Sequence, residues 1–334
     1  MNLKYYIKMT FTFIDLCCGI GGFHKGLRKG KCVLACDINK ECREIYAKNY
    51  KISPLSNIFD IKNKNIPDHN ILCAGFPCQP FSSAGKQNGM DDIRFNVYYK
   101  ILSIIKKKKP NIIMLENVKN IITINEGKVI RKIIKDLNDL HYNISYSTLN
   151  TSSFGLAQNR ERVFIIGIYK KYKNKTFNFQ QLKSINNKKI LKDICDLSNK
   201  NYIERNKYVL LQDEKIKIQP SGLIFCGYIK GNIRIAGVKP NTEHLSRVHK
   251  QPNRIYHING VHPTLSSSES SGRYYIYDGI GVRKLSVQEC YKIMGFKKFI
   301  CHEKSTICYK QAGNAVSPKI IKYIRKELIK QDII

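Results

Sequence analysis

The stretch TFIDLCCGIGG, residues 12–22, decides the fold expected for this chain. Its first half is a short apolar run typical of a buried strand, and its second half is a glycine-rich turn that leads into helical spacing up to about residue 29. A second apolar run at residues 31–37 ends on Asp37, and a helical pattern follows it over residues 39–50. A strand, a glycine turn, a helix and another strand form the opening of an alternating α/β fold.

The N-terminal half of the chain keeps this alternation. Apolar runs with the length of central parallel strands occur at residues 70–75, 111–116 and 162–168, and helical spacing occurs at residues 93–107 and 126–140. We therefore expect a doubly wound α/β domain over residues 1–169.

The sequence changes character after this domain. Residues 170–280 lack long periodic runs and are rich in Lys, Gly, Ser and Asn, which predicts a second, smaller and loop-rich domain. Helical spacing returns at residues 286–294 and 317–330. We expect these helices to bring residues 281–334 back to the first domain.

The chain is strongly basic, with 58 Lys and Arg against 25 Asp and Glu and a net charge of +33. Such a charge attracts polyanions, of which nucleic acid is the first candidate. The excess is carried by 45 Lys against 13 Arg, beside many Ile, Asn and Tyr. Codon bias toward A and T explains part of that composition, so the charge by itself is limited evidence for nucleic acid. A membrane surface also remains open as a partner.

The apolar and cysteine patterns restrict the class of protein. No apolar run reaches the length of about 18 residues that a membrane-spanning helix needs, and the N-terminus lacks the pattern of a secretion signal. The 12 cysteines are scattered, without a CxxC pair or zinc-like spacing. These patterns predict a cytoplasmic protein with free thiols and no metal site.

The glycine turn and Asp37 together predict a cofactor site. Glycines let a ligand approach the backbone closely, and the helix that follows offers unpaired N–H groups. Asp37, at the end of the next strand, is placed to accept the two hydroxyl groups of a ribose. The GxGG spacing departs from the GxGxxG pattern of dinucleotide sites, so an adenosine-containing cofactor other than NAD is favoured.

Two side chains at strand ends are candidates for chemistry. Cys78 lies in GFPCQPFS, residues 75–82, between two prolines and just past a strand, which suits a nucleophile. Glu116 ends the run at residues 111–116 and is a candidate proton donor. A packed loop cysteine and a capping or ion-paired glutamate are the plain alternatives.

A third motif is QNRER at residues 158–162. If this segment is extended, Gln158, Arg160 and Arg162 share one face, where arginines can bind a phosphate or a base edge. A salt-bridged strand edge is the alternative.

With these residues in hand, the chain resembles the DNA (cytosine-5)-methyltransferases of bacterial restriction–modification systems. The matching blocks span residues 13–316 and are FIDLCCGIGGF, CDI, FDI, GFPCQPFS, ENV, QNRER, RIYHINGVHPTL and QAGNAV. The resemblance implies a Rossmann-like domain that uses S-adenosyl-L-methionine and a smaller target-recognition domain. Residues 1–169 would form the catalytic domain, residues 170–280 the target-recognition domain, and residues 281–334 the returning segment.

The resemblance also implies a role for each matching residue. Cys78 would attack C6 of a cytosine flipped out of duplex DNA, Glu116 would hold its N3 and amino group, and Arg162 would contact its O2, with Arg160 supporting the site. The implied cofactor residues are Cys17, Gly19, Ile20, Gly21, Gly22, Asp37, Ile38, Asp60, Ile61, Pro77, Val97, Asn314 and Ala315. The implied DNA-binding residues are Gln87, Arg94, Gln251, Arg254 and Thr264.

Two positions of the implied cofactor site depart from the family pattern. Cys17 stands where the family often has Phe, and Ile38 stands where an aromatic residue commonly follows the ribose-binding acid. We therefore expect weaker stacking on the adenine but the same cofactor.

The resemblance further predicts the partners and the nearest rival function. It implies double-stranded DNA as the substrate, no membrane, a monomer that is cytoplasmic and associated with the nucleoid, and a separate cognate restriction endonuclease. A tRNA cytosine-5 methyltransferase of the same family is the alternative, and the long variable region argues against it.

Overall fold

The computed structural model describes residues 11–77, 93–185, 188–231 and 241–334, with the backbone alone for residues 93–96. The chain divides into two compact units. Unit 1 comprises Met1–Leu149, Arg162–Lys183 and Val316–Ile334, and unit 2 comprises Asn150–Glu161 and Ser184–Ala315. Each unit is described by itself.

Unit 1 is built on a six-stranded sheet with the order β2-β1-β3-β4-β7-β5. The strands are β1 (Thr12–Leu16), β2 (Lys31–Cys36), β3 (Ile71–Gly75), β4 (Ile112–Val118), β5 (Tyr142–Asn150) and β7 (Glu161–Tyr169). The strand β1 pairs in parallel with β2 and β3, and β3 pairs in parallel with β4, whereas β7 runs antiparallel to β4. The register places Leu16 beside Cys36 and Ala74, and Gly75 beside Glu116. The carboxyl ends of these four parallel strands therefore meet at one edge of the sheet.

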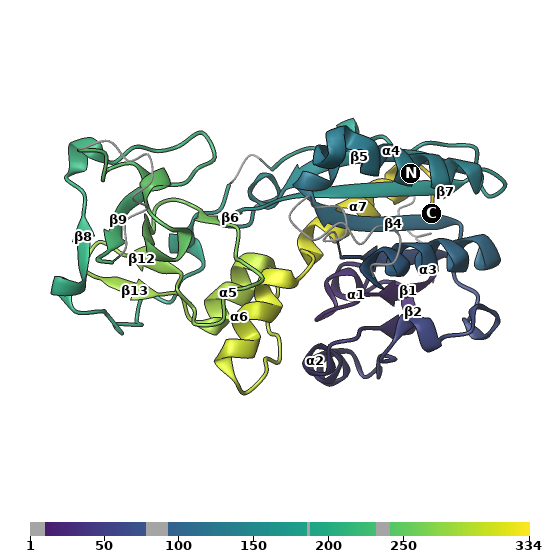
Figure 1. Cartoon of the computed structure of the whole chain (residues 1–334), viewed down its shortest axis with the longest axis horizontal. Coiled ribbons are helices and arrows are strands. Elements are labelled where there is room, and N and C mark those ends of the chain that lie inside the picture. Colours follow the sequence, from purple (N-terminus) through teal and green to yellow (C-terminus); the bar gives the residue numbers. More distant parts are fainter. Residues whose placement is uncertain (1–10, 78–92, 186–187, 232–240) are drawn as a thin grey trace, which may run out of the picture. The chain divides into compact units, whose positions relative to one another are not determined.

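The helices of unit 1 follow from apolar stripes that cover the sheet. They are α1 (Gly22–Gly26), α2 (Lys40–Tyr50), α3 (Ile93–Lys108), α4 (Lys128–Asp139) and α7 (Pro318–Lys330). In α4 the buried residues Val129, Ile130, Ile133 and Leu137 recur at helical spacing and join the main core. The short helix α1 packs on α7 (Figure 1), and a Cβ at Gly26 would lie only 2.4 Å from Ile321 Cβ.

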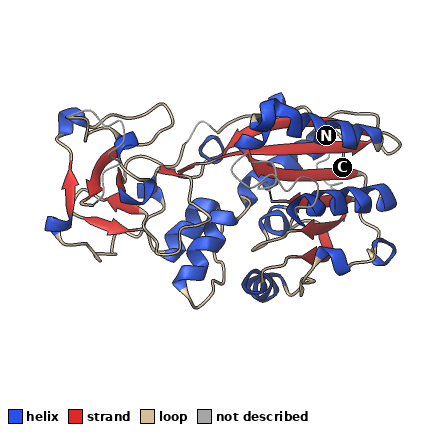
Figure 2. Cartoon of the chain, in the orientation of Figure 1, coloured by secondary structure: helices blue, strands red, loops and turns tan. Residues whose placement is uncertain are grey.

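Unit 2 contains short strands connected by long loops, as Figure 2 makes plain. Its five-stranded sheet has the order β13-β12-β10-β9-β8, and β11 pairs in parallel with β6. Two α-helices complete the described part of the unit, and strand residues Tyr208, Cys226, Ile255 and Val282 form a small core. The bounds are β6 (Gln158–Asn159), β8 (Tyr208–Leu210), β9 (Phe225–Ile229), β10 (Arg254–His257), β11 (His262–Pro263), β12 (Tyr275–Tyr277), β13 (Val282–Lys284), α5 (Val287–Met294) and α6 (Ser305–Asn314).

The expected doubly wound α/β fold is confirmed, but the returning segment is shorter than expected. Only Val316–Ile334 belong to unit 1, and residues 281–315 belong to unit 2. Two contacts hold residues 281–315 in unit 2. Arg283 and Glu289 form a buried ion pair, and both side chains bind the backbone of Asp196. In addition, α5 packs on α6. Within the described part of the chain, no helix has the length and hydrophobicity needed to cross a membrane.

Candidate functional site

The glycine turn connects β1 to α1 at the carboxyl edge of the sheet. Cys17, Gly19 and Gly21 all have positive φ, at 52°, 52° and 82°. The Tyr50 hydroxyl on α2 donates to the carbonyl oxygens of Ile20 at 3.2 Å and Gly21 at 2.9 Å. A Cβ at Gly21 would lie 2.2 Å from the Tyr50 ring. Tyr50 therefore holds the turn in place, a role for which the sequence gives no signal beyond an aromatic residue at a helix end.

The turn and the end of β2 are joined through Asp37. Asp37 Oδ2 accepts the Gly19 N–H at 2.7 Å, and Oδ1 accepts the Asn39 N–H at 2.8 Å. Burial raises the pKa of Asp37, and the two backbone N–H groups oppose that rise. The Asp37 carboxylate is thus fixed in orientation beside the turn.

The remaining predicted cofactor residues of unit 1 flank this edge. Ile38 is 83% exposed, although it directly follows Asp37. The Asp60 carboxylate accepts a hydrogen bond from Asn57 Nδ2 at 3.2 Å, and Ile61 is buried in the core against which Val97 packs. Pro77 is half-buried at the end of the described segment that follows β3.

Glu116 and Arg162 face each other on the paired strands β4 and β7. Arg162 Nε lies 3.4 Å from Glu116 Oε1, and only 8% of Glu116 is exposed. Burial lowers the pKa of Arg162, and the Glu116 carboxylate opposes that fall. On the other side, a Cβ at Gly75 would lie 3.7 Å from Glu116 Oε2. Glu116 is therefore a buried carboxylate beside the end of β3.

The segment that leads from β3 toward Cys78 is held against β4, because Asn117 Nδ2 donates to the Phe76 carbonyl at 3.0 Å. Cys78 and Gln87 themselves lie outside the described residues, as does the side chain of Arg94 on α3. The Glu116 carboxylate and the described end of the Cys78 segment thus share the carboxyl edge of neighbouring strands.

Arg160 has different partners from Arg162. Arg160 is 2% exposed, and its guanidinium donates to the carbonyls of Ala315 at 3.0 Å and Leu265 at 3.5 Å, all within unit 2. The strand β6 ends at Asn159 and β7 begins at Glu161, so QNRER is not one uninterrupted strand. Nearby, the Thr264 hydroxyl donates to the Asn159 carbonyl at 3.0 Å. Arg160 and Thr264 therefore bind the segment around the end of β6 to the rest of unit 2. In the same unit, Asn314 is exposed at the end of α6.

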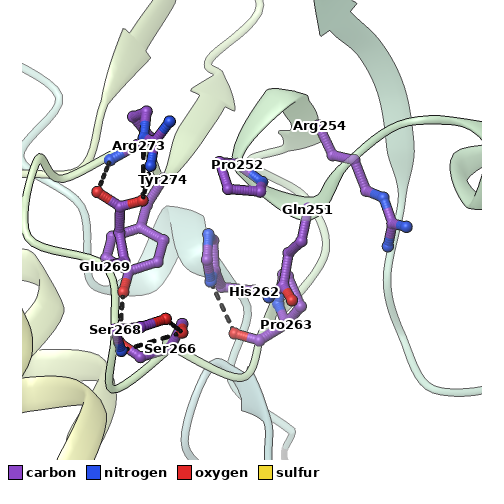
Figure 3. A pocket seen from close by; sticks show the side chains of 10 residues that line it. All are labelled: Gln251, Pro252, Arg254, His262, Pro263, Ser266, Ser268, Glu269, Arg273 and Tyr274. Carbon is purple, nitrogen blue, oxygen red and sulfur yellow. Dashed lines mark hydrogen bonds and ion pairs between the residues drawn. The ribbon is translucent and has the colours of Figure 1, made fainter. Parts of the chain in front are cut away.

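Unit 2 also contains a cavity of about 220 Å³ (Figure 3). Gln251 lines it and donates from Nε2 to the Thr264 carbonyl at 3.0 Å. In Figure 3 the Arg254 guanidinium points away from the other lining residues, and its Nε donates to the His249 carbonyl at 3.0 Å. Sequence reasoning missed the far wall, formed by the buried Glu269 carboxylate and by Arg273 at 3.0 Å from it. The polar run that follows Thr264 was the available signal.

Among residues 11–77, 93–185, 188–231 and 241–334, no three His, Cys, Asp or Glu side chains are grouped so that they could hold a metal ion. Of the residues singled out in the sequence, the structure brings four sets together. They are the turn with Asp37, Glu116 with Arg162, Arg160 with Ala315, and Gln251 with Thr264.

The chain is similar to known proteins in both sequence and fold. Type II methyltransferase M.HhaI of Haemophilus parahaemolyticus is 32% identical over 326 residues, covering 93% of this chain and 92% of that protein. Type II methyltransferase M.HaeII of Haemophilus aegyptius is 33% identical over 325 residues, covering 96% and 93%. The crystal structure of S. pombe Dnmt2 methyltransferase shares the fold, with a TM-score of 0.69 at 18% identity over 96% of this chain and 99% of that one. A family model described as C-5 cytosine-specific DNA methylase matches residues 11–330, and the chain therefore belongs to that family.

Proposed function

We propose that this protein transfers a methyl group from S-adenosyl-L-methionine to C5 of a cytosine in double-stranded DNA. The observation that carries the proposal is the buried Glu116 carboxylate, paired with Arg162 beside the segment that leads to Cys78. The family membership and the net charge of +33 support DNA as the substrate.

The residues at the carboxyl edge of unit 1 fit the cofactor. A Cβ at Gly19 would meet no atom within 4 Å, so the space beside the turn is open. Asp37, fixed by two backbone N–H groups, keeps lone pairs for the ribose hydroxyls, and the exposed Ile38 offers an apolar face to the adenine. When bound, S-adenosyl-L-methionine supplies the methyl group as an electrophile. Cys17, Ile20, Gly21 and Gly22 would form the wall of its site, completed by Asp60, Ile61, Pro77 and Val97.

The chemistry requires a nucleophile because cytosine C5 is itself a poor one. The Cys78 thiolate would form a bond to C6, which moves an electron pair toward C5 and lets C5 accept the methyl group. A base would then take the C5 proton, the C5–C6 double bond would form again, and the C6–S bond would break to release the thiolate.

Glu116 and Arg162 would stabilise the charge that this addition creates. Glu116 would hold N3 and the exocyclic amino group of the base, and the Arg162 guanidinium would donate to O2. Both groups are already held by each other at 3.4 Å in a buried place, so little reorganisation is needed when the base arrives. Arg160 would act through the backbone carbonyls of Leu265 and Ala315 that it binds.

Cytosine stacked in a duplex cannot reach these groups, so the base would be flipped out. We propose that unit 2 is the target-recognition unit, with Gln251, Arg254 and Thr264 at or beside its 220 Å³ cavity, and with Gln87 and Arg94 as further DNA contacts. We further propose that the protein acts as a monomer beside a separate restriction endonuclease.

The test is methyl transfer from labelled S-adenosyl-L-methionine to duplex DNA and, in parallel, to tRNA. We expect label on DNA at cytosine C5, located by bisulfite sequencing, and none with Cys78→Ser. Label on tRNA but not on DNA would establish the alternative of a tRNA methyltransferase and contradict the proposal.

A further inference from the structure

The far wall of the cavity in unit 2 holds an arginine that is bound to a buried carboxylate. The side chain of Glu269 is 4% exposed, and Arg273 Nε donates to its Oε2 at 3.0 Å. Arg273 Nη2 also lies 3.0 Å from this oxygen. Figure 3 shows the two side chains together, on the other side of the cavity from Gln251. The Arg273 guanidinium is therefore held in one orientation at the cavity wall.

The loop that carries this pair is itself held in place. Glu269 Oε1 accepts the backbone N–H groups of Ser271 at 2.6 Å and Arg273 at 3.4 Å. Gly272 has a φ of 64°, and a Cβ there would lie 2.4 Å from the Tyr309 ring on α6. The guanidinium is thus preorganised, so little conformational entropy is lost when it binds a ligand.

Part of the guanidinium remains available to a ligand. Nε and one N–H of Nη2 serve Glu269, and Nη1 has no partner in the described part of the chain. The Arg273 side chain is 50% exposed. The outer N–H groups of Nη1 and Nη2 form a planar fork, and this fork matches the O6 and N7 acceptors on the major-groove edge of guanine.

The ion pair favours a base edge over a backbone phosphate. The negative charge of Glu269 offsets the positive charge of Arg273, so the pair attracts an anion only weakly. A guanine edge carries no net charge and is recognised through two parallel hydrogen bonds, which the fixed guanidinium still offers. Base-edge contacts specify a sequence, whereas phosphate contacts only position the duplex.

We propose that Arg273 reads a guanine in the DNA sequence that the protein methylates, an inference that rests on the proposed methyl transfer. Its Nη1 and Nη2 donate to O6 and N7 of that guanine, while Glu269 keeps the guanidinium in orientation. Arg273 is then a specificity-determining residue in addition to Gln251 and Arg254.

The test begins with duplexes that carry random bases around a cytosine. After methylation, bisulfite sequencing identifies the sequences that the unmodified protein selects, and we expect a fixed G·C pair at one position beside the cytosine. In Arg273→Gln the preference for this pair should fall by about 5- to 150-fold, while the other positions keep theirs. Arg205→Gln, at an exposed arginine of the same unit, is the matched control and should keep the full preference.

Arg273→Lys separates reading from folding. It keeps a positive charge beside the buried Glu269, but an ammonium group does not offer a planar fork of two donors. We therefore expect the same loss of preference as in Arg273→Gln.

A base analogue tests the contact atom by atom. Replacing the guanine by 7-deazaguanine removes the N7 acceptor and should weaken binding of the unmodified protein about fivefold or more, measured by anisotropy. The same replacement should leave binding by Arg273→Gln unchanged.

The outcomes distinguish this inference from the proposed function. Absence of C5 methylation on every duplex would refute the proposed function and, with it, the guanine contact. A defined methylated sequence that Arg273→Gln and Arg273→Lys select as strictly as the unmodified protein would refute the guanine contact alone. Binding that Arg273→Gln weakens equally for all sequences, with a smaller dependence on salt, would assign Arg273 to a phosphate and would also refute it.

Discussion

Replacing Gly22 by Ala tests whether the glycine turn depends on close backbone contact. A Cβ at this position would lie 2.1 Å from the Val316 carbonyl oxygen and 2.8 Å from its carbonyl carbon, whereas ordinary contacts begin near 3.4 Å. The obstacle is the backbone of Val316, two residues before α7, so no side-chain rotation relieves it. The variant must shift the turn and α7 apart.

The expected size of the effect follows from two opposing contributions. Overpacking against an unyielding neighbour costs about 3 kcal/mol. Ala gains about 1 kcal/mol over Gly in a helix, and Gly22 is the first residue of α1. The free energy of unfolding should therefore fall by about 2 kcal/mol, with a fall in Tm of roughly 4–8 °C.

The assay is urea unfolding followed by far-ultraviolet circular dichroism, since the chain has no Trp for fluorescence. Gly19→Ala is the matched control, because its Cβ would meet nothing within 4 Å and only its φ of +52° is strained, at about 1 kcal/mol. Gly22→Ala should thus lose more stability than Gly19→Ala. For the affinity for S-adenosyl-L-methionine, measured by calorimetry, Gly19→Ala should lose more, because its Cβ fills the open space of the site. A Gly22→Ala protein as stable as the unmodified one would refute the reasoning.

Three further outcomes are expected. Glu289→Gln should lower the free energy of unfolding at neutral pH by about 3 kcal/mol or more in urea melts, because it leaves the buried Arg283 without its carboxylate. The stability of the protein should fall in melts between pH 6.5 and about 4, because burial lowers the pKa of His262 to about 4 and the unfolded state binds the proton first. In His262→Leu the free energy of unfolding should fall less over the same pH range. An equal fall in both proteins would exclude His262 as a cause of the pH dependence. Arg254→Ala should cost about 1–3 kcal/mol in binding the methylated sequence and relax its preference, measured by anisotropy with matched and mismatched duplexes.

Short-range patterns predicted unit 1 well. The apolar runs of β1, β3, β4 and β7 are buried on both faces, so their length and composition mark them as strands. The turn, Asp37 and Glu116 were also predictable, since the parallel strands β1 to β4 bring their carboxyl ends to one edge of the sheet. The strand β5 was not predicted, because half-buried and polar residues break its apolar pattern.

Unit 2 was less predictable because long-range contacts determine it. Nothing local indicates that Arg283 pairs with Glu289 and binds Asp196 at 87 residues' distance, yet this contact assigns α5 to unit 2. The helix α6 has few apolar residues at helical spacing and was missed as well. The resemblance predicted that Arg160 supports the site, but no local pattern indicated its contacts with two backbone carbonyls more than 100 residues away in sequence.

Covalent trapping on duplex DNA that contains 5-fluorocytosine tests the central claim most directly. Fluorine at C5 cannot leave as a proton, so the C6–S bond persists after methyl transfer, and the adduct can be digested and sequenced. We expect one adduct, on Cys78, that requires S-adenosyl-L-methionine, forms more slowly in Glu116→Gln and is absent in Cys78→Ala. Methylated 5-fluorocytosine without an adduct, or an adduct on another cysteine, would contradict the account.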